Sequence, residues 1–396
     1  MTTAAALERS EPISARAWQA LAVSAAGYVL FGFNSTATNL AFGDIADSFD
    51  GVSQTTVSWV ASAFFIASAA FLPLGGRLAD RLGRRRIFNI GLIWFSFSAV
   101  LSAIAPNVWV LIGARALQAI AGALVIPSSL AMILPEFPVS RRSTAVAAWS
   151  AAGPLAAAIA PTTAALLLGV TSWRWVYAIS APVALITFVL AFRFVNESSG
   201  EGGEDRLDLG GTVLAVAGIG LLVVGISQGS EWGWSSAATV LVLAEALGMA
   251  IVFVIRSSNH AAPLLNIELF RIPAVAIANL ANFFISITSL SIWLLWPLWL
   301  GRVWGYEPWR IGLAITAGPI FAGTSTILSG RLVERVGHRW PMIVGTGIST
   351  CAVLWSYFMF DPEPNYWLRF FPTIAGFGVG WGLSQPTMNS WALSHV

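Results

Sequence analysis

The sequence predicts an all-α polytopic membrane protein. Hydrophobic residues make up 57% of its 396 residues, and charged residues make up only 10%. Soluble domains are about 45–50% apolar and about 25% charged, so a chain of this composition suits lipid rather than water. The apolar residues gather in long runs, and the arginines gather in the short segments between those runs.

The apolar runs predict about 12 transmembrane helices, because a helix needs about 20 apolar residues to cross a bilayer. In chain order the spans are predicted at 18–42, 54–75, 87–106, 107–131, 144–169, 173–195, 209–228, 236–256, 273–300, 310–329, 341–360 and 367–393.

The placement of charge predicts the orientation, because cytoplasmic loops carry an excess of basic residues. A cytoplasmic N-terminus puts most of the arginines on the cytoplasmic side. It leaves only Arg174, Arg302, Arg310 and Arg369 on the outer side. The expected localisation is therefore the cell membrane, with a multi-pass topology and the N-terminus inside.

Two segments interrupt the series of spans and divide the chain. Residues 196–208 form a polar loop after six spans, and residues 257–272 have the pattern of a short interfacial helix. We therefore expect four parts. They are a cytoplasmic tail at 1–17, a six-helix bundle at 18–195, a loop with an inserted helix pair at 196–260, and a partial C-terminal bundle of four helices at 261–396.

The composition argues against several classes of function. One cysteine and three histidines do not support a disulfide framework or a metal site. The chain has no lysine and no G-x-x-x-x-G-K-[S/T] motif, so ATP is not expected as the energy source. A net charge of +2, with the arginines at the ends of apolar runs, argues against nucleic-acid binding. We expect no cofactor, no metal and no enzymatic activity.

Two charged segments share the pattern G-R-L-x-[D/E]-R-x-G-x-R, at 76–86 and 330–339. Repetition of a charged loop in an apolar chain indicates equivalent positions in two related halves. The candidate gating residues of these loops are Gly76, Asp80, Arg81, Gly83, Arg84 and Arg85 in the first, and Gly330, Glu334, Arg335 and Gly337 in the second. The simpler interpretation is a pair of positively charged inner loops, but Gly76 and Gly83 also predict a tight turn.

The first charged segment resembles the loop between helices 2 and 3 of the major facilitator superfamily. Further stretches resemble the fourteen-span drug:proton antiporter branch of that family. Arg115-Ala116-Leu117-Gln118 resembles its helix-4 motif, and Gly153-Pro154 resembles its helix-5 motif. The resemblance implies the major facilitator fold, in which two six-helix bundles face each other.

The sequence also departs from that branch. Asn34 stands where the branch has an aspartate in its first helix, and Ala157-Ala158 stands where helix 5 has a glycine pair. With twelve predicted spans instead of fourteen, the second bundle is expected to be incomplete and to lack its last two helices.

The resemblance implies secondary active transport, and most directly the proton-coupled efflux of small amphipathic or cationic compounds, of the multidrug or antibiotic type, by alternating access. The implied partners are a small-molecule substrate, protons and the lipid bilayer. Two alternatives stay open from the departures. One is a truncated, non-transporting membrane protein with a binding or scaffold role. The other is a transporter that is not coupled to protons.

Three polar side chains are candidates for proton coupling or for the cavity. Arg115 and Gln118 share one face of the fourth span, and Glu245 is the only acid deep in a predicted span. Charges at such depth are costly and commonly functional. The alternatives are a structural arginine that snorkels to the interface, and a neutral glutamic acid that faces lipid or a neighbouring helix.

The substrate-cavity candidates are Asn34 and Thr38 in the first span, and Asn279 and Asn282 in the ninth. In repeat-built transporters such helices line opposite sides of a central cavity. Interhelical hydrogen bonding is the other interpretation. Gly153 and Pro154 are expected to loosen the fifth span. Trp293, Trp296 and Trp299 suit either a bulky ligand or, as favoured, an interfacial belt of tryptophans.

Overall fold

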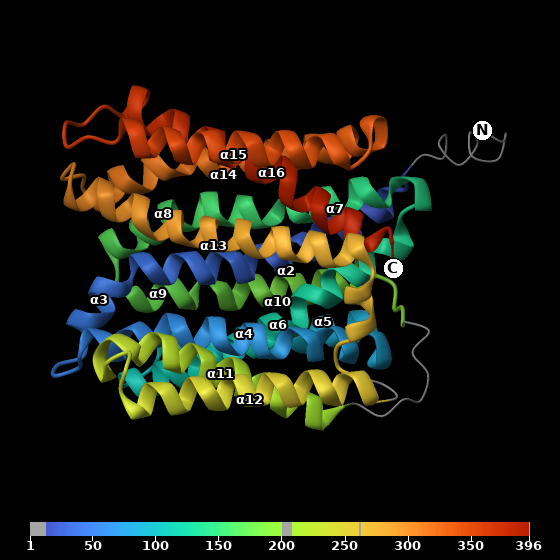
Figure 1. The fold of residues 1–396 in the computed structure, drawn as a ribbon, viewed down its shortest axis with the longest axis horizontal. Helices are drawn as coiled ribbons and strands as arrows, with labels where there is room; N and C mark the ends of the chain where they lie inside the picture. The colour runs from blue at the N-terminus through green and yellow to red at the C-terminus, as the bar shows by residue number, and fades with distance from the viewer. Residues whose placement is uncertain (1–12, 200–207, 261–262, 396) are drawn as a thin grey trace. The chain divides into compact units, whose positions relative to one another are not determined.

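The computed structural model describes residues 13–199, 208–260 and 263–395, and this part of the chain is helical without strands (Figure 1). The long helices are α2 (Ala15–Leu40), α4 (Gln54–Leu82), α5 (Arg84–Ala103), α6 (Val108–Ile133), α8 (Ala152–Val170), α10 (Ser180–Phe194), α11 (Leu209–Trp232), α12 (Ala237–Asn259), α13 (Pro273–Arg302), α14 (Pro308–Val336), α15 (Arg339–Met359) and α16 (Phe371–Leu393). The short ones are α3 (Phe42–Asp47), α7 (Arg142–Ser150), α9 (Trp173–Ala178), the 3-10 turns η1 (Leu134–Glu136), η2 (Val139–Arg141) and η3 (Ile267–Arg271), and the π-turn η4 (Tyr366–Phe370).

Eleven helical segments within the described residues are long and apolar enough to cross a membrane. They match the first eleven predicted spans, with α7–α8 and α9–α10 each counting as one. The twelfth predicted span is the 23-residue helix α16, whose glycines and polar residues lower its hydropathy. The prediction of about 12 transmembrane helices is therefore confirmed.

Prolines explain where two of the spans break. Proline lacks the N–H that would bond to the carbonyl four residues earlier. Pro154 therefore leaves the carbonyl of Ser150 without its helical donor, and α7 ends at Ser150. In the same way, α9 ends at Ala178, four residues before Pro182. The expected loosening of the fifth span around Gly153-Pro154 is present as this break.

The two charged segments are shorter turns than the sequence indicated. Gly76 and Gly330 lie inside α4 and α14, so the prediction that Gly76 takes part in a tight turn was wrong. Each helix runs on until one residue before the second glycine of the pattern. The chain turns only at Gly83 (φ 104°) and Gly337 (φ 77°), in a region that glycine enters without strain.

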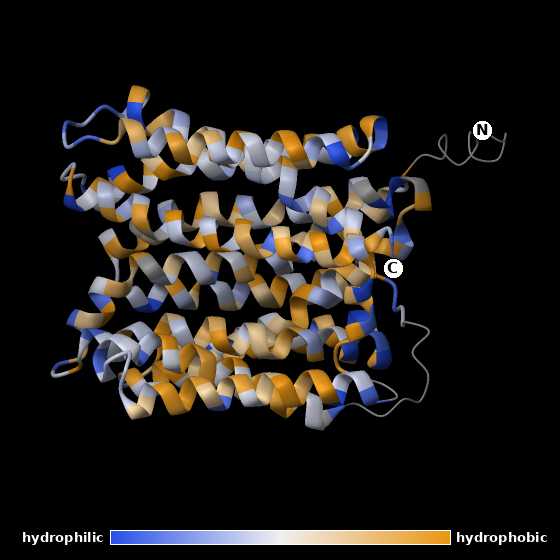
Figure 2. Ribbon diagram, viewed as in Figure 1, coloured by the Kyte–Doolittle hydropathy of each residue, from blue (hydrophilic) through white to orange (hydrophobic). Residues whose placement is uncertain are grey.

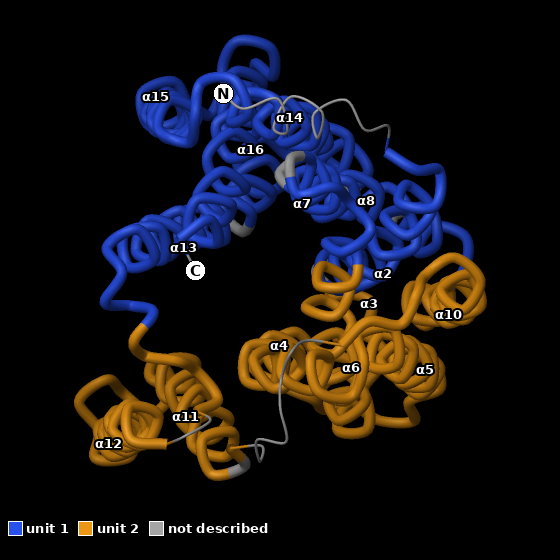
Figure 3. Tube along the Cα trace, turned by 90° about the vertical axis from the view of Figure 1, so that its right-hand side faces the viewer, with its two compact units in different colours: residues 1–41, 133–172, 269–396 blue, residues 42–132, 173–268 orange. Residues whose placement is uncertain are grey.

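The described chain forms two compact units, coloured separately in Figure 3. Unit 1 comprises residues 1–41, 133–172 and 269–396, and unit 2 comprises residues 42–132 and 173–268. Unit 1 thus groups α2, α7 and α8 with the C-terminal helices. The four-part division at 17, 195 and 260 remains a proposal about the organisation of the chain. The predicted tail 1–17 and hinge loop 196–208 lie partly outside the described residues.

Glycines set the packing in unit 1. Helix α16 carries Gly376, Gly378, Gly380 and Gly382 at every second position. A Cβ added at Gly378 would overlap the carbonyl oxygen of Gly318 on α14, and one added at Gly380 would overlap the carbonyl oxygen of Gly345 on α15. Small residues at these points let helix backbones approach closely in lipid. Helix α16 is therefore held between α14 and α15 at backbone contact.

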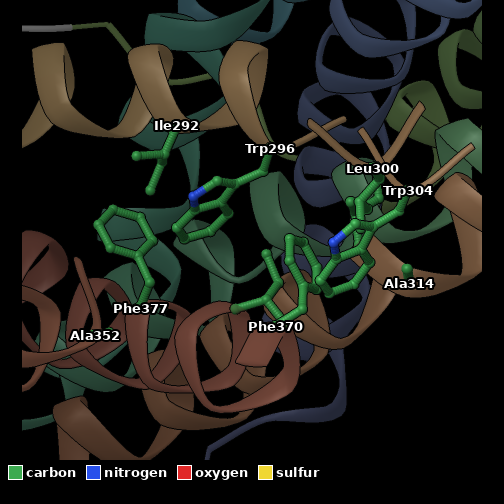
Figure 4. Close-up of a cluster of buried hydrophobic side chains, with 10 residues drawn as sticks. Ile292, Trp296, Leu300, Trp304, Ala314, Ala352, Phe370 and Phe377 are labelled. Carbon is green, nitrogen blue, oxygen red and sulfur yellow. The ribbon is translucent and has the colours of Figure 1, made fainter. Parts of the chain in front are cut away.

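An aromatic cluster forms the core at one end of unit 1 (Figure 4). The ring of Trp296 on α13 lies edge-on to Phe370 at 5.9 Å and to Phe377 at 5.8 Å between centroids. Trp304 donates from its ring nitrogen to the carbonyl oxygen of Asp361 at 2.8 Å. Edge-to-face pairs of this kind each contribute about 0.5–1.5 kcal/mol beyond area burial, so this end of α13 is firmly fixed.

Hydrophilic residues lie at the helix ends, and hydrophobic residues cover the helix bodies (Figure 2). Within each unit, the loop contacts join segments that were predicted to lie on the same side of the membrane. In unit 2, Arg77 donates to the carbonyl oxygen of Pro263, which joins two predicted inner segments. In unit 1, Arg369 pairs with Asp361 at 3.0 Å, which joins two predicted outer ones. The predicted alternation of helix direction agrees with these contacts.

The interfacial segment is less regular than the sequence indicated. A short helix was expected within 257–272. Helix α12 instead continues to Asn259, and the described residues that follow, 260 and 263–272, contain one helical turn, the five-residue η3. Pro263 and Pro273 bound this stretch and limit the backbone N–H groups available to a longer helix.

Asp208 links the start of α11 to the end of α12 in the inserted helix pair. Its Oδ1 accepts hydrogen bonds from the backbone N–H of Gly211 at 2.7 Å and from Nε of Arg256 at 2.9 Å, and its side chain is fully buried. Burial alone would raise the pKa of this carboxyl, but the Gly211 N–H and the Arg256 guanidinium outweigh that effect and hold the pKa below its usual value.

We expect Asp208→Asn to lower the melting temperature of the detergent-purified protein at pH 7. A carboxylate with a lowered pKa stabilises the fold above its unfolded-state pKa of about 4 and loses this contribution as pH falls through the folded value. The deficit of the variant should therefore shrink below about pH 4. Asp47→Asn, at an exposed residue, is the control and should change the melting temperature little at either pH. A deficit independent of pH would contradict the ionic role of Asp208.

Candidate functional site: a pocket in unit 1 and two charged turns

A pocket of about 370 Å³ lies within unit 1, at the middle of its helices. Five helices contribute to it. The lining residues are Tyr28, Phe31, Gly32, Ser35 and Thr36 of α2, Gly153, Pro154 and Ala157 of α8, Ser286, Ser289, Leu290, Trp293 and Trp296 of α13, Gly318, Pro319 and Ala322 of α14, and Ile374, Phe377, Gly378, Trp381 and Gln385 of α16. The volume falls in the range of about 300–1,000 Å³ that is typical of small-molecule sites.

Aromatic rings make up the large surfaces of this pocket. Trp296 and Phe377 belong to the packed cluster of unit 1, so the wall they form is rigid. Tyr28, which lines the pocket from α2, stacks on Trp149 at 4.5 Å, and this contact fixes its ring. A Cβ added at Gly153 would lie only 3.0 Å from the hydroxyl of Tyr28, so this glycine leaves room for the tyrosine. The ring of Tyr28 on α2 and those of Trp296 and Phe377 on α13 and α16 therefore offer apolar surfaces to a flat apolar molecule.

Hydroxyl and amide groups supply the polar part of the lining. The hydroxyl of Ser35 donates to the carbonyl oxygen of Gly32, and that of Ser289 donates to Ile285. Their oxygen lone pairs stay available as acceptors. The side-chain amide of Gln385 has no hydrogen bond to any of the described residues, so it can both donate to and accept from a ligand. The lining contains no charged side chain.

The four predicted cavity residues do not line this pocket. Asn34 and Thr38 are buried on α2, where Asn34 donates to Leu30 and Thr38 donates to the carbonyl oxygen of Asn34. Asn279 donates to Val275 in its own helix, and Asn282 donates to Asn389 of α16 at 2.8 Å. The pocket side of α2 is formed by neighbours of Asn34, and the pocket side of α13 begins one turn after Asn282. The role of these four residues in substrate binding stays a prediction.

The helix-5 motif and two of the three tryptophans do lie at the pocket. Gly153 and Pro154 line it, as do Trp293 and Trp296, although a belt was favoured for these tryptophans. Trp299 instead packs on Phe360 at 5.5 Å. Sequence reasoning missed Gln385 and Trp381 altogether. A deep amide within the last apolar run was the available signal for Gln385.

Arg115 lies buried within unit 2. Its guanidinium donates to Gln118 Oε1 at 2.5 Å and to the carbonyl oxygen of Val60 at 3.4 Å. The same group sits over the ring of Phe64 at 4.1 Å and over that of Tyr177 at 5.2 Å. Arg115 and Gln118 are almost fully buried, so this cluster joins α4, α6 and α9. A role in proton relay stays a prediction.

Glu245 has a different environment from the other candidates. It lies on α12 of unit 2, its residue is exposed, and the pocket of unit 1 does not include it. Its role in coupling is a prediction without support from contacts with the pocket residues.

The first charged turn is an interlocked structure within unit 2. Arg84 donates from Nε and Nη2 to Oδ1 of Asp80, at 3.1 and 3.0 Å, and from Nη1 to the carbonyl oxygen of Ala131 at 3.0 Å. Arg85 donates to the carbonyl oxygen of Val195 at 3.2 Å. Arg81 is exposed. The two arginines at the start of α5 therefore make different links: Arg84 joins the ends of α4 and α6, and Arg85 reaches the end of α10.

Glu197 completes this turn, and the sequence pattern did not reveal it. Its carboxylate accepts from the backbone N–H groups of Arg85 at 3.0 Å and Arg86 at 3.1 Å, which lie in the first turn of α5 and have no acceptor within the helix. A carboxylate at a helix N-terminus is favoured by these donors and by the helix dipole. Gly83 makes room, because a Cβ there would approach the Glu197 carboxylate to 2.8 Å.

We expect Glu197→Ala to reduce the free energy of unfolding by about 1 kcal/mol, the usual value of a lost N-cap. Chemical denaturation in detergent measures this. Glu268→Ala, which removes an exposed acid elsewhere in the same unit, is the matched control. Equal stability of the two variants would contradict the capping role.

The second charged turn is built around Glu334 in unit 1. Thr144 donates to Glu334 Oε1 at 2.7 Å, and Arg141 pairs with Oε2 at 3.8 Å. Arg335 is exposed, and Gly337 supplies the turn. The acid of each charged turn therefore pairs with an arginine, Asp80 with Arg84 of its own turn and Glu334 with Arg141 near α7.

Comparison with known proteins points to a single family. The family model described as Major Facilitator Superfamily matches residues 24–396. Among curated relatives, the "Multidrug resistance protein Stp" of Mycobacterium tuberculosis is 30% identical over 332 residues, which cover 83% of this chain and 61% of that protein. The chain thus spans about three fifths of the length of this relative.

Two further relatives are longer than the chain as well. The "Lincomycin resistance protein LmrB" of Bacillus subtilis is 28% identical, with 82% of this chain and 68% of that protein covered. The "Probable actinorhodin transporter" of Streptomyces coelicolor is 29% identical, with 97% of this chain and 68% of that protein covered. Among solved structures, the proton:xylose symporter XylE matches with a TM-score of 0.66 at 16% identity, over 96% of this chain and 82% of that one. This structural match establishes a common fold.

Proposed function

Because the chain belongs to the major facilitator superfamily, we propose that it is a secondary active transporter that exports small amphipathic compounds. In this proposal, substrate binds in the pocket of unit 1, the protein alternates its access between the two sides of the membrane, and the proton gradient supplies the energy.

Family membership and the candidate spans make the chain a multi-pass protein of the cell membrane, as the sequence predicted. The relatives carry names of transport and drug resistance. These names support a transport activity, rather than an enzymatic reaction, as the proposal for this chain.

The observation that carries the proposal is the pocket of unit 1. It lies at the middle of α2, α13 and α16, where repeat-built transporters hold their substrates. Its two aromatic walls suit the apolar face of an amphipathic molecule, and Gln385 with the serine hydroxyls suits the polar edge. A cation would rely on the faces of Trp293 and Trp381, whose ring quadrupoles attract positive charge by about 0.5–2 kcal/mol.

The charged turns support the gating part of the proposal. Ion pairs at exposed helix ends are individually weak, at about 0–1 kcal/mol, so they can break and re-form during a transport cycle. Glu334 is held by an ion pair of this kind with Arg141 and by a hydrogen bond from Thr144. We propose that this contact opens when access to the pocket changes.

Transport without proton coupling is the second candidate. The observation in its favour is the pocket lining, whose polar groups are hydroxyls and amides. Asn34, at the position where the family branch has an aspartate, accords with this. A non-transporting membrane protein is the third.

Reconstitution separates these candidates. The purified chain is placed in liposomes that carry a pH-sensitive dye, a pH gradient is imposed, and movement of rhodamine 6G is followed together with the lumenal pH. Coupled movement of dye and protons is the expected result. Dye movement without proton flux would contradict coupling, and binding without movement would contradict transport.

A matched pair of variants controls for dye that partitions into lipid. Trp381→Ala removes an aromatic wall of the pocket, and Trp309→Ala removes an exposed tryptophan outside it. The first should strongly reduce dye movement at low dye concentration, and the second should leave it unchanged. Equal rates in both variants would show that the dye does not pass through this pocket.

A further inference from the structure

Helix α12 carries an acidic side chain on an exposed face within its predicted span. Glu245 is the ninth residue of this 23-residue helix, about 12 Å along the axis from Ala237. Only 11% of the apolar 18-residue stretch of α12 is buried, and Glu245 itself is exposed. Helix α12 packs chiefly on α11, at the edge of unit 2 (Figure 3).

The environment of Glu245 leaves its carboxyl group unsatisfied. Within the described residues it has no hydrogen bond and no ion pair. An acid at the centre of a membrane helix costs roughly 2.5–3.5 kcal/mol by insertion scales, and a glutamate side chain is too short to reach the headgroups from this depth. A protonated carboxyl group carries both an O–H donor and a carbonyl acceptor.

We propose that this face of α12 docks against the same face of a second copy of the chain. Copies inserted by the same rule share one orientation, so a two-fold axis along the membrane normal brings the two α12 helices together in parallel. Each residue on the axis then meets its own counterpart at equal depth. A neutral carboxyl group is self-complementary, because each Glu245 can donate its O–H to the carbonyl oxygen of the other.

The neighbours of Glu245 have the form that such a contact requires. Leu241, Glu245, Gly248 and Val252 follow the spacing i, i+4, i+7, i+11, which places them on one seam of the helix. Leu241 is 62% exposed and Val252 is 51% exposed. Nothing lies within 4 Å of a Cβ added at Gly248, so a partner helix can approach closely at that point. Ala244, another small residue, lies one turn before Gly248 and adds to the space at this point.

This interface is independent of the proposed transport activity. It assigns the inserted pair α11–α12 a role in assembly, and it holds whether or not the pocket of unit 1 carries a substrate.

Cysteine cross-linking in native membranes tests the proposal. The single cysteine, Cys351, is first replaced in a Cys351→Ser background. Leu241→Cys and Val252→Cys then probe the seam. Leu247→Cys is the control, because it is equally exposed but lies about 160° around the helix from Glu245. Mild oxidation should give a disulfide-linked dimer at 241 and 252, and at least fivefold less at 247.

Two substitutions in the Val252→Cys background test the carboxyl itself. Glu245→Gln keeps a donor and an acceptor and should keep the dimer, whereas Glu245→Leu should reduce the cross-linked fraction at least fivefold. Because Glu245 is exposed, leucine there should not impair folding, and an unchanged melting temperature verifies this. Monomers throughout, equal cross-linking at 247, a cross-linked species with the mass of another protein, or an undiminished dimer in Glu245→Leu would each overturn the proposal.

Discussion

Replacing Gly380 by valine is expected to destabilise unit 1 by about 3 kcal/mol or more, enough to prevent stable purification. A Cβ at this position would overlap the carbonyl oxygen of Gly345 and the backbone nitrogen of Ser349 on α15. Because the obstacles belong to the backbone of a packed helix, relief requires α15 and α16 to separate. Overpacking of this kind costs about 1–3 kcal/mol even where side chains can adjust.

The matched control is Gly347→Val on α15. No atom lies within 4 Å of a Cβ added at Gly347, so the substitution should leave the melting temperature unchanged or slightly raised. Thermal unfolding of both variants in the same detergent compares them. If Gly380→Val were as stable as Gly347→Val, the close contact of α15 and α16 would be wrong.

Replacing Arg115 by methionine is expected to lower the free energy of unfolding by about 3 kcal/mol. The loss has two sources. Gln118 Oε1 and the carbonyl oxygen of Val60 each lose a hydrogen bond from a charged donor, at about 1.5–3 kcal/mol for bonds to charged groups. The rings of Phe64 and Tyr177 lose a desolvated cation, which is worth about 2 kcal/mol. These contributions overlap and do not add in full.

Ligand affinity discriminates this structural role from a functional one. Arg115 belongs to unit 2 and does not line the pocket of unit 1, so Arg115→Met should change the dissociation constant of rhodamine 6G less than twofold. Arg81→Met, at an exposed arginine, is the control for stability. A stable Arg115→Met protein that binds dye but takes up no protons would instead support the proton-relay hypothesis.

Local sequence signals predicted the features that depend on one helix at a time. Apolar run length located the spans, and the spacing of arginines predicted the alternation of helix ends. Pro154 marked a position where a backbone hydrogen bond is lost, and α7 ends four residues before it. The equivalent break before Pro182, where α9 ends, was not predicted. The charged pattern identified both turns, although only its second glycine, Gly83 or Gly337, has a positive φ.

Features that depend on which helices meet were not predictable in the same way. Gly345 and Gly380 are needed only because α15 and α16 come together, and nothing in either run specifies its partner. Glu197 follows α10 in the chain but caps α5, more than a hundred residues earlier. The pocket illustrates the same limit. Its polar side on α2 is formed by Ser35 and Thr36 rather than by Asn34, and helical periodicity alone cannot choose between these faces.

Equilibrium binding of rhodamine 6G to the detergent-purified chain tests directly whether the substrate binds in the pocket of unit 1. Fluorescence anisotropy gives the dissociation constant for the unmodified protein, for Trp293→Ala and Trp381→Ala in the pocket, and for Trp309→Ala outside it. Loss of one aromatic wall should cost about 2 kcal/mol, which corresponds to a dissociation constant roughly thirtyfold higher. We expect this increase for both pocket variants and no more than a twofold change for Trp309→Ala. Equal dissociation constants in all four proteins would contradict binding in this pocket.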